Sequence, residues 1–179
     1  MDGIVSVLPQ PVYTQVEEIW DSLERDLGLK GIRVTPYPHF SWQIAESYSS
    51  DELSEALGSI AKETRPFHVS TSGLGVFCGE SPVVYVPVVI TTELLEFHRK
   101  VWDKLFSIGS VLSPYYAPDH WVPHISLAYA DVSIDTIGTV MEKLAFRSYS
   151  WNFLVNNISW IYEPSGSIGR LRAKVDFEG

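Results

Sequence analysis

The chain has 179 residues with 22 acidic and 13 basic side chains, so its formal net charge is −9. Apolar residues make up 45% and charged residues 20% of the sequence, which excludes a disordered or collagen-like chain. The negative charge argues against binding of long duplex nucleic acid through a basic face, but it is compatible with a pocket for a nucleotide or a short RNA end.

Cysteine usage and hydropathy give expectations about the compartment. Cys78 is the only cysteine, which excludes an intramolecular disulfide and a cysteine-based zinc site. The sequence has no apolar run of 18 residues, and its first residues lack the basic and apolar regions of a signal peptide. We therefore expect a location in the cytoplasm. We also expect the protein to be a monomer.

Strand-like and helix-like patterns alternate along the chain. Helices with apolar residues at 3-and-4 spacing are predicted to open at Pro9–Pro11, Ser50, Thr91 and Ser133. Short apolar or alternating runs predict strands at 4–8, 39–45, 67–77, 83–90, 124–130, 149–162 and 168–177, with a turn at 163–167.

This order reads β-α-β-α-β followed by β-α-β-α-β-β, which indicates an internal duplication. The short connections favour antiparallel pairing. We predict an α+β fold in which residues 1–179 form a single bilobal domain. Its pseudo-symmetric halves, roughly 1–82 and 83–179, would enclose a central cleft.

Two octapeptides occupy the same place in the two halves and start 85 residues apart. Residues 38–45 read PHFSWQIA and residues 123–130 read PHISLAYA, so the proline, histidine, serine and final alanine match. Because alternate side chains of a strand share a face, we expect the polar faces to carry His39, Ser41 and Gln43 in one strand and His124, Ser126 and Ala128 in the other. The opposite faces, with Ile44 and Tyr129, would pack against helices.

Two histidines that face each other across a cleft suit phosphodiester chemistry. Imidazole titrates near neutral pH, so one ring can accept a proton while the other donates one. The hydroxyl groups of Ser41 and Ser126 would donate hydrogen bonds to phosphate oxygens, where negative charge must be stabilised. No metal and no cofactor is required by this set.

The two tripeptides His39-Phe40-Ser41 and His124-Ile125-Ser126, each followed by an apolar residue, resemble the signature of the two-histidine (2H) phosphoesterase superfamily. That superfamily includes the 2′-5′ RNA ligase-like proteins and the cyclic phosphodiesterases. The resemblance implies hydrolysis of a 2′,3′-cyclic or related phosphodiester, with the two histidines as the acid–base pair and the two serines on the phosphate. The chain departs from the usual signature in having serine where threonine is commoner.

Other residues have less specific patterns. A third tripeptide, His68-Val69-Ser70, lacks the preceding proline and the following apolar residue, so we interpret it as an outer-sheet segment. His98, on a helix, is interpreted as structural. Base stacking is a candidate role for Tyr115 and Trp121, which precede the second octapeptide. Arg33, Arg170 and Arg172 are candidates for a phosphate contact or for solvated surface charges.

Three alternatives to hydrolysis stay open. The cleft could bind a cyclic nucleotide without turnover, and the same residues could catalyse the reverse reaction, 2′-5′ RNA ligation. A third alternative is an interaction protein that retains the fold and uses its aromatic surface. In that case, replacing His39 or His124 would have no effect on function.

Overall fold

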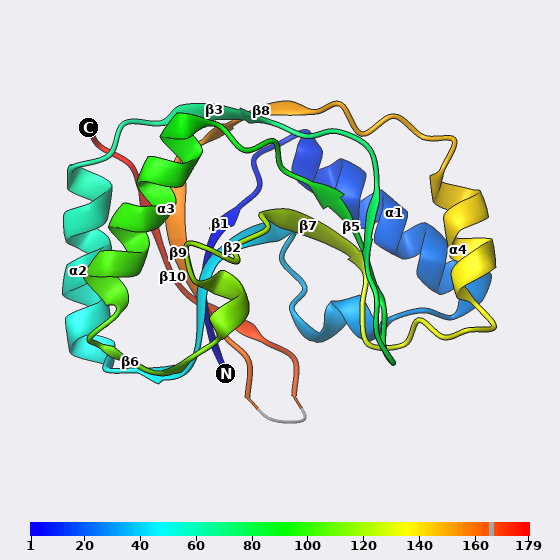
Figure 1. The fold of residues 1–179 in the computed structure, drawn as a ribbon, viewed down its shortest axis with the longest axis horizontal. Helices are drawn as coiled ribbons and strands as arrows, with labels where there is room; N and C mark the ends of the chain where they lie inside the picture. The colour runs from blue at the N-terminus through cyan, green and yellow to red at the C-terminus, as the bar shows by residue number, and fades with distance from the viewer. Residues whose placement is uncertain (165–166) are drawn as a thin grey trace.

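The computed structural model describes residues 1–164 and 167–179, so part of the predicted turn at 163–167 lies outside the described residues. The fold is mixed α/β with antiparallel strand pairing, as predicted (Figure 1). The helices are α1 (Val12–Leu27), α2 (Ser50–Lys62), α3 (Thr92–Leu105) and α4 (Ile137–Leu144), with short 3₁₀ turns η1 (Gly31–Val34) and η2 (Pro114–Tyr116). The strands are β1 (Asp2–Val7), β2 (His39–Tyr48), β3 (Phe67–Ser70), β4 (Gly75–Phe77), β5 (Val83–Pro87), β6 (Gly109–Leu112), β7 (His124–Ala128), β8 (Asn152–Val155), β9 (Asn157–Tyr162) and β10 (Arg170–Asp176).

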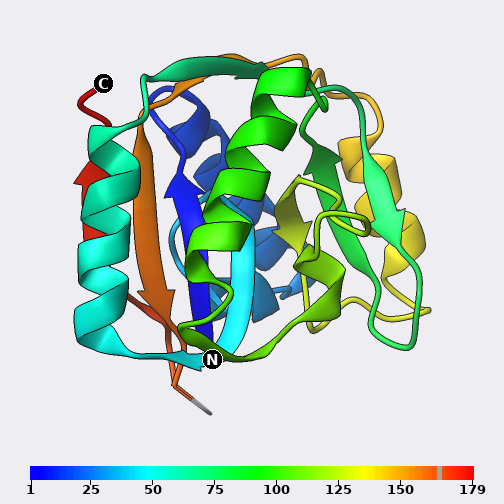
Figure 2. The same ribbon diagram turned by 60° about the vertical axis from the view of Figure 1, so that its left-hand side comes forward.

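A five-stranded sheet, in the order β10-β9-β1-β2-β6, forms the larger layer. Helices α2 and α3 lie side by side over one face of it (Figure 2). Both helices bury an apolar face because their apolar residues recur every three or four positions. The residues buried in this way include Leu53, Leu57, Ile60, Leu94 and Val101.

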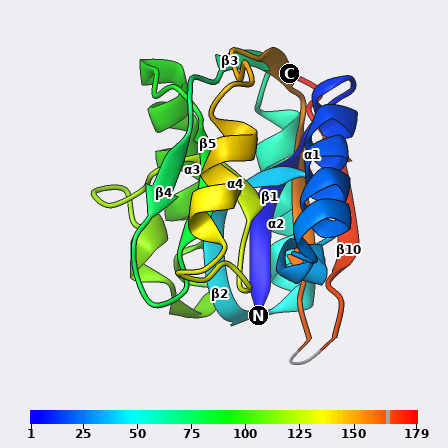
Figure 3. The ribbon, with the colours of Figure 1, turned by 90° about the vertical axis from the view of Figure 1, so that its right-hand side faces the viewer.

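A three-stranded sheet, in the order β4-β5-β7, forms the second layer, and α1 and α4 lie beside it (Figure 3). Helix α1 buries Val16, Trp20 and Leu23 among its apolar residues and ends at Gly28, as predicted. Gly28 adopts a φ of +72°, the left-handed conformation that terminates many helices. A third sheet of only β3 and β8 connects the two layers along the top of Figure 1.

The two sequence halves do not each form a lobe, so the predicted division at residue 82 is wrong. All three sheets combine strands from both halves; for example, β1 and β2 pair with the late strands β9 and β6. The reason is that two predicted strands are each split between sheets. Residues 67–77 divide into β3 and β4 around Gly73, whose φ is +69°, and residues 149–162 divide into β8 and β9.

Smaller differences concern element ends. Strand β6 was not predicted from the sequence, because this four-residue edge segment has no alternation. Helix α4 begins at Ile137 rather than at Ser133, whose backbone N–H instead bonds the Thr136 hydroxyl. Among the described residues, no helix has the length and apolar character needed to span a bilayer.

Candidate active site

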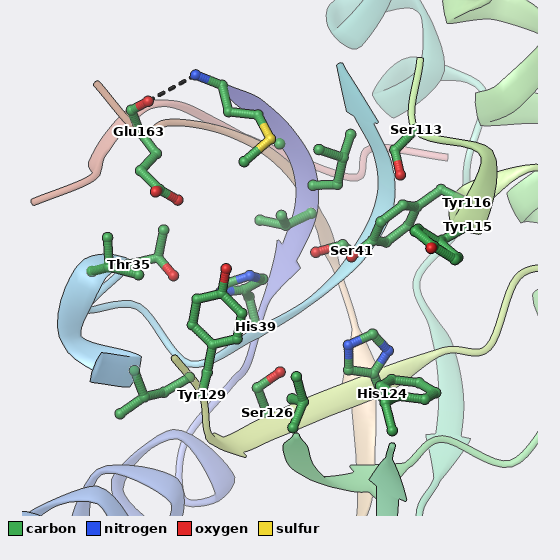
Figure 4. A pocket seen from close by; sticks show the side chains of 18 of the residues that line it. Thr35, His39, Ser41, Ser113, Tyr115, Tyr116, His124, Ser126, Tyr129 and Glu163 are labelled. Atoms are coloured by element: carbon green, nitrogen blue, oxygen red, sulfur yellow. Dashed lines mark hydrogen bonds between the residues drawn. The ribbon is translucent and has the colours of Figure 1, made fainter. Parts of the chain in front are cut away.

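A cavity of about 900 Å³ lies between β2 and β7, the strands that carry the two octapeptides. His39 and Ser41 line it from β2, and His124 and Ser126 line it from β7 (Figure 4). The four residues singled out in the sequence therefore share one cavity. The expectation that the two His-Ser pairs face a common cleft is met by the geometry.

The two histidine rings are held in the same way. The Nδ1 atom of His39 lies 2.5 Å from the carbonyl oxygen of Tyr37, and that of His124 lies 2.7 Å from the carbonyl oxygen of Val122. A carbonyl only accepts hydrogen bonds, so Nδ1 carries the proton in both rings. In the neutral form Nε2 is therefore the free acceptor of each imidazole, as a general base requires.

Burial shifts both histidines toward the neutral form. It lowers the pKa of His39 to about 4, and the nearby His124 contributes to that shift, although the Tyr37 hydrogen bond opposes it. Burial also lowers the pKa of His124, against the opposing effect of its bond to Val122. Two imidazoles in one cavity disfavour each other's charge, so at most one of them is readily protonated.

Each motif strand has a β-bulge directly after its serine. In the β1–β2 ladder, Val5 pairs with Ser41 and Ile4 with Gln43, which leaves Trp42 without a partner. In the β5–β7 ladder, Leu127 is skipped in the same way, between Ser126 and Ala128. A bulge inserts one residue and changes which side chains face each side of the strand.

The bulges correct the predicted alternation beyond the serines. Ile44 and Tyr129 line the cavity, although strict alternation placed them on the opposite face. Gln43 is instead fully buried and accepts a hydrogen bond from the Tyr48 hydroxyl at 2.7 Å, and Ala128 is 2% exposed. The sequence pattern missed Ile44 and Tyr129 because alternation contains no sign of an inserted residue.

Two tryptophans support the serine backbones. The indole N–H of Trp20, on α1, donates to the carbonyl of Ser126 at 3.1 Å, and that of Trp121 donates to the carbonyl of Ser41 at 2.9 Å. Trp121 is 5% exposed and stacks on His98, with ring centroids 3.9 Å apart. The prediction that Trp121 stacks on a base is therefore wrong for this structure, because its ring is already packed inside the protein.

Aromatic side chains also surround His124. The rings of Phe77 and Tyr85 stack on each other and both contact the His124 ring, at centroid distances of 4.9 and 5.2 Å. The Tyr85 ring occupies the space where a Cβ at Gly75 would lie. A side chain at position 75 would therefore displace the packing that orients His124.

The loop around η2 forms the aromatic wall of the cavity. Tyr115 lines it and is 78% exposed, whereas Tyr116 extends toward Ser41 (Figure 4). Buried His98 holds this loop against β2, because its Nε2 lies 3.1 Å from the carbonyl oxygens of both Trp42 and Tyr116. His98 thus has the structural role predicted for it.

The remaining candidates lie outside the cavity. His68 is exposed and bonds Asn152 in the two-stranded sheet, in agreement with an outer-sheet position. Arg33 pairs with Asp21 and Glu24, and Arg172 stacks over the rings of Tyr162 and Trp160. None of the three arginines considered from the sequence, Arg33, Arg170 and Arg172, is among the described residues that line the cavity.

Comparison with known proteins identifies the family. The model of the 2′-5′ RNA ligase superfamily matches residues 8–166. The chain belongs to this superfamily, which is the 2H phosphoesterase family that the two tripeptides resemble. It is also 28% identical over 131 residues to "Putative phosphoesterase OB1230" of Oceanobacillus iheyensis, a match that covers 70% of this chain and 71% of the relative.

Solved structures share the fold. TT0787 of Thermus thermophilus superposes with a TM-score of 0.70 at 16% identity, covering 99% of this chain and 98% of the other. E. coli LigT complexed with 3′-AMP gives a TM-score of 0.59 at 13% identity, with coverage of 99% and 98%. At 16% and 13% identity, these superpositions show a shared architecture and nothing further about the cavity.

Proposed function

We propose that this superfamily member is a metal-independent phosphodiesterase that opens a 2′,3′-cyclic phosphate, or a related cyclic or 2′-5′ diester, on a nucleotide or short oligonucleotide. The observation that carries the proposal is the placement of His39 and His124 in one cavity. Both rings present an unprotonated Nε2 when neutral. Binding alone would not require two titratable groups with matched ring orientation.

The hydrolytic step uses one ring as base and the other as acid. The base accepts a proton from water through Nε2 while the water oxygen forms a bond to phosphorus. The bond from phosphorus to one ribose oxygen breaks, and the acid donates its Nε2 proton to that oxygen. In-line displacement requires the base and the acid on opposite sides of the phosphorus, which suits two histidines on opposite walls of the cavity. Each proton transfer typically raises the rate by a factor of about 10² to 10⁴.

The hydroxyl groups of Ser41 and Ser126 are proposed to donate hydrogen bonds to the non-bridging phosphate oxygens. Both line the cavity next to the histidines, and tryptophan indoles hold both serine backbones. Donors that are fixed before the reaction stabilise developing charge without a cost of reorganisation. The serines thus supply anion binding that a metal ion provides in other phosphodiesterases.

A nucleotide substrate is supported by size, by aromatic lining and by the family. A cavity of about 900 Å³ accommodates a nucleotide, and Tyr115 offers an exposed ring for base stacking. Solved structures of the same fold contain 3′-AMP in E. coli LigT and uridine monophosphate in Kluyveromyces marxianus Usb1. A cytoplasmic location and a monomeric state stay predictions from the sequence.

The test is turnover of 2′,3′-cyclic nucleotides and a 2′-5′ linked dinucleotide in the presence of EDTA. We expect product from the unmodified protein and losses of about 10² or more for His39→Ala and for His124→Ala. His68→Ala is the matched control, because His68 belongs to the third His-x-Ser tripeptide but bonds Asn152 outside the cavity. Activity that survives either cavity substitution excludes the two-histidine mechanism.

Three alternative functions predict different results for the same variants. A binding module would retain nucleotide affinity, measured by calorimetry, without any turnover. A ligase would form a 2′-5′ bond from a cyclic phosphate end and a 5′-hydroxyl end, and it would lose that activity in the same two histidine variants. The unchanged function of both variants would instead favour an interaction protein.

A further inference from the structure

One end of the cavity is lined by two hydroxyl groups and a carboxylate. Thr35, Tyr129 and Glu163 lie together there, on one side of the histidine pair, and the Glu163 carboxylate extends toward the cavity (Figure 4). The backbone carbonyl of Glu163 accepts a hydrogen bond from the amino group of Met1 at 2.8 Å. That bond fixes the residue directly after β9, at the rim of the cavity.

Two carboxylates line the cavity. Among the described lining residues there is no lysine or arginine; the carboxylates of Asp2 and Glu163 are accompanied by the amino group of Met1 and the imidazoles of His39, His120 and His124. The Asp2 carboxylate is buried and accepts hydrogen bonds from the Trp160 indole and the Tyr48 backbone, at 2.8 and 3.2 Å. Both oxygens of the Asp2 carboxylate therefore have hydrogen-bond donors within the protein, so Asp2 is not available to a ligand.

Glu163 is the carboxylate that is available to a ligand. Within residues 1–164 and 167–179 its side chain makes no hydrogen bond and no ion pair. A carboxylate accepts hydrogen bonds and repels anions. The neighbouring hydroxyl groups of Thr35 and Tyr129 can donate or accept, so this end of the cavity favours an uncharged group with donors, such as a ribose hydroxyl or a base amino group.

We propose that Thr35, Tyr129 and Glu163 form a subsite that binds an uncharged, hydrogen-bond-donating part of the substrate and excludes a second phosphate. The inference rests on the proposed function and narrows it to cyclic phosphodiesters that carry no further phosphate group. It also gives a reason for product release. Ring opening converts a singly charged diester into a monoester that gains a second charge near neutral pH, and Glu163 disfavours that product.

The test compares adenosine 2′,3′-cyclic phosphate with the same compound carrying a 5′-phosphate. We expect the unmodified protein to prefer the first by about tenfold or more in kcat/KM, which corresponds to about 1.4 kcal/mol. Glu163→Gln keeps the size and removes the charge, so it is expected to reduce this preference to about threefold or less. Glu52→Gln, on the exposed first turn of α2, is the matched control and leaves the preference unchanged.

Equal kcat/KM for both compounds in the unmodified protein would overturn the inference, and so would an unchanged preference in Glu163→Gln. Calorimetry with adenosine 3′-phosphate and adenosine 3′,5′-bisphosphate separates this outcome from failure of the proposed function. Selective binding of the first without any turnover leaves the subsite standing and rejects the phosphodiesterase. Turnover without selective binding supports the phosphodiesterase and rejects the subsite. The absence of both turnover and binding rejects the subsite and the phosphodiesterase.

Discussion

Trp42 and Leu127 are the unpaired residues of equivalent β-bulges, each directly after the serine of a His-x-Ser tripeptide. Each bulge keeps the histidine and serine on the cavity side and then brings the residue five positions after the histidine, Ile44 or Tyr129, to that side as well. The two strands therefore repeat one backbone geometry with different side chains. In the function proposed above, the repeated part binds the reacting phosphate, and the side chains that differ, Ile44 and Tyr129, line the rest of the cavity.

The first prediction concerns that backbone geometry. Gln43→Ala is expected to lower the free energy of unfolding by about 1 to 3 kcal/mol, because it leaves the buried Tyr48 hydroxyl without its acceptor. Ile44→Ala is expected to change KM, because Ile44 lines the cavity. Urea denaturation and steady-state kinetics of both variants check this. A change of KM in Gln43→Ala with none in Ile44→Ala would contradict the bulge.

The second prediction concerns the serine hydroxyl groups. Ser41→Ala and Ser126→Ala are each expected to lower kcat by about ten- to a hundredfold, because each removes one donor to the phosphate while the backbone carbonyl keeps its tryptophan bond. Ser70→Ala is the control, since Ser70 occupies the same tripeptide position on β3, away from the cavity. Replacement by threonine, which retains the hydroxyl, should restore most of the rate.

Much of the fold and the central residues of the site could be predicted from the sequence, because hydrophobic periodicity and a repeated tripeptide are local signals. The pairing of strands from the two sequence halves within each sheet could not be predicted in this way. It depends on breaks near Gly73 and between β8 and β9, which divide each of two predicted strands between two sheets. The position of Trp121 beside the octapeptide predicts a place in the cavity, but its stacking on His98 is a long-range contact that no sequence spacing indicates.

The third prediction is the pH dependence of kcat/KM, which reports pKa values of the free enzyme. Burial lowers the pKa of His39 to about 4, so His39 suits the base, and activity should rise with pH through that value. His124 must then be protonated as the acid. Burial lowers its pKa below the ordinary 6.5, so activity should fall again as pH rises through a value under 6.5. A profile that is flat from pH 4 to 8 would contradict this assignment.

The fourth prediction concerns acid stability and His98. Burial lowers the His98 pKa to about 4, whereas the unfolded chain has the ordinary value near 6.5. The unfolded state therefore binds the proton first, and stability is lost as pH falls from 6.5 toward 4, by about 3 kcal/mol for this group. His98→Gln retains a donor for the Trp42 and Tyr116 carbonyls but does not titrate. Urea denaturation at pH 7 and pH 4 should show a smaller loss in this variant, and equal losses in both proteins would exclude His98 as the source.

The fifth prediction separates the two aromatic candidates for base stacking. Tyr115 is exposed at the cavity, so Tyr115→Ala is expected to raise KM for cyclic nucleotides by about five- to a hundredfold, while Tyr115→Phe keeps the ring and stays near the unmodified value. Trp121→Phe removes the bond to the Ser41 carbonyl and is expected to lower stability by about 1 kcal/mol without changing the preference among bases. Kinetics with adenine, guanine, cytosine and uracil substrates check both variants. A change of base preference in Trp121→Phe alone would show that the buried indole, rather than Tyr115, reads the base.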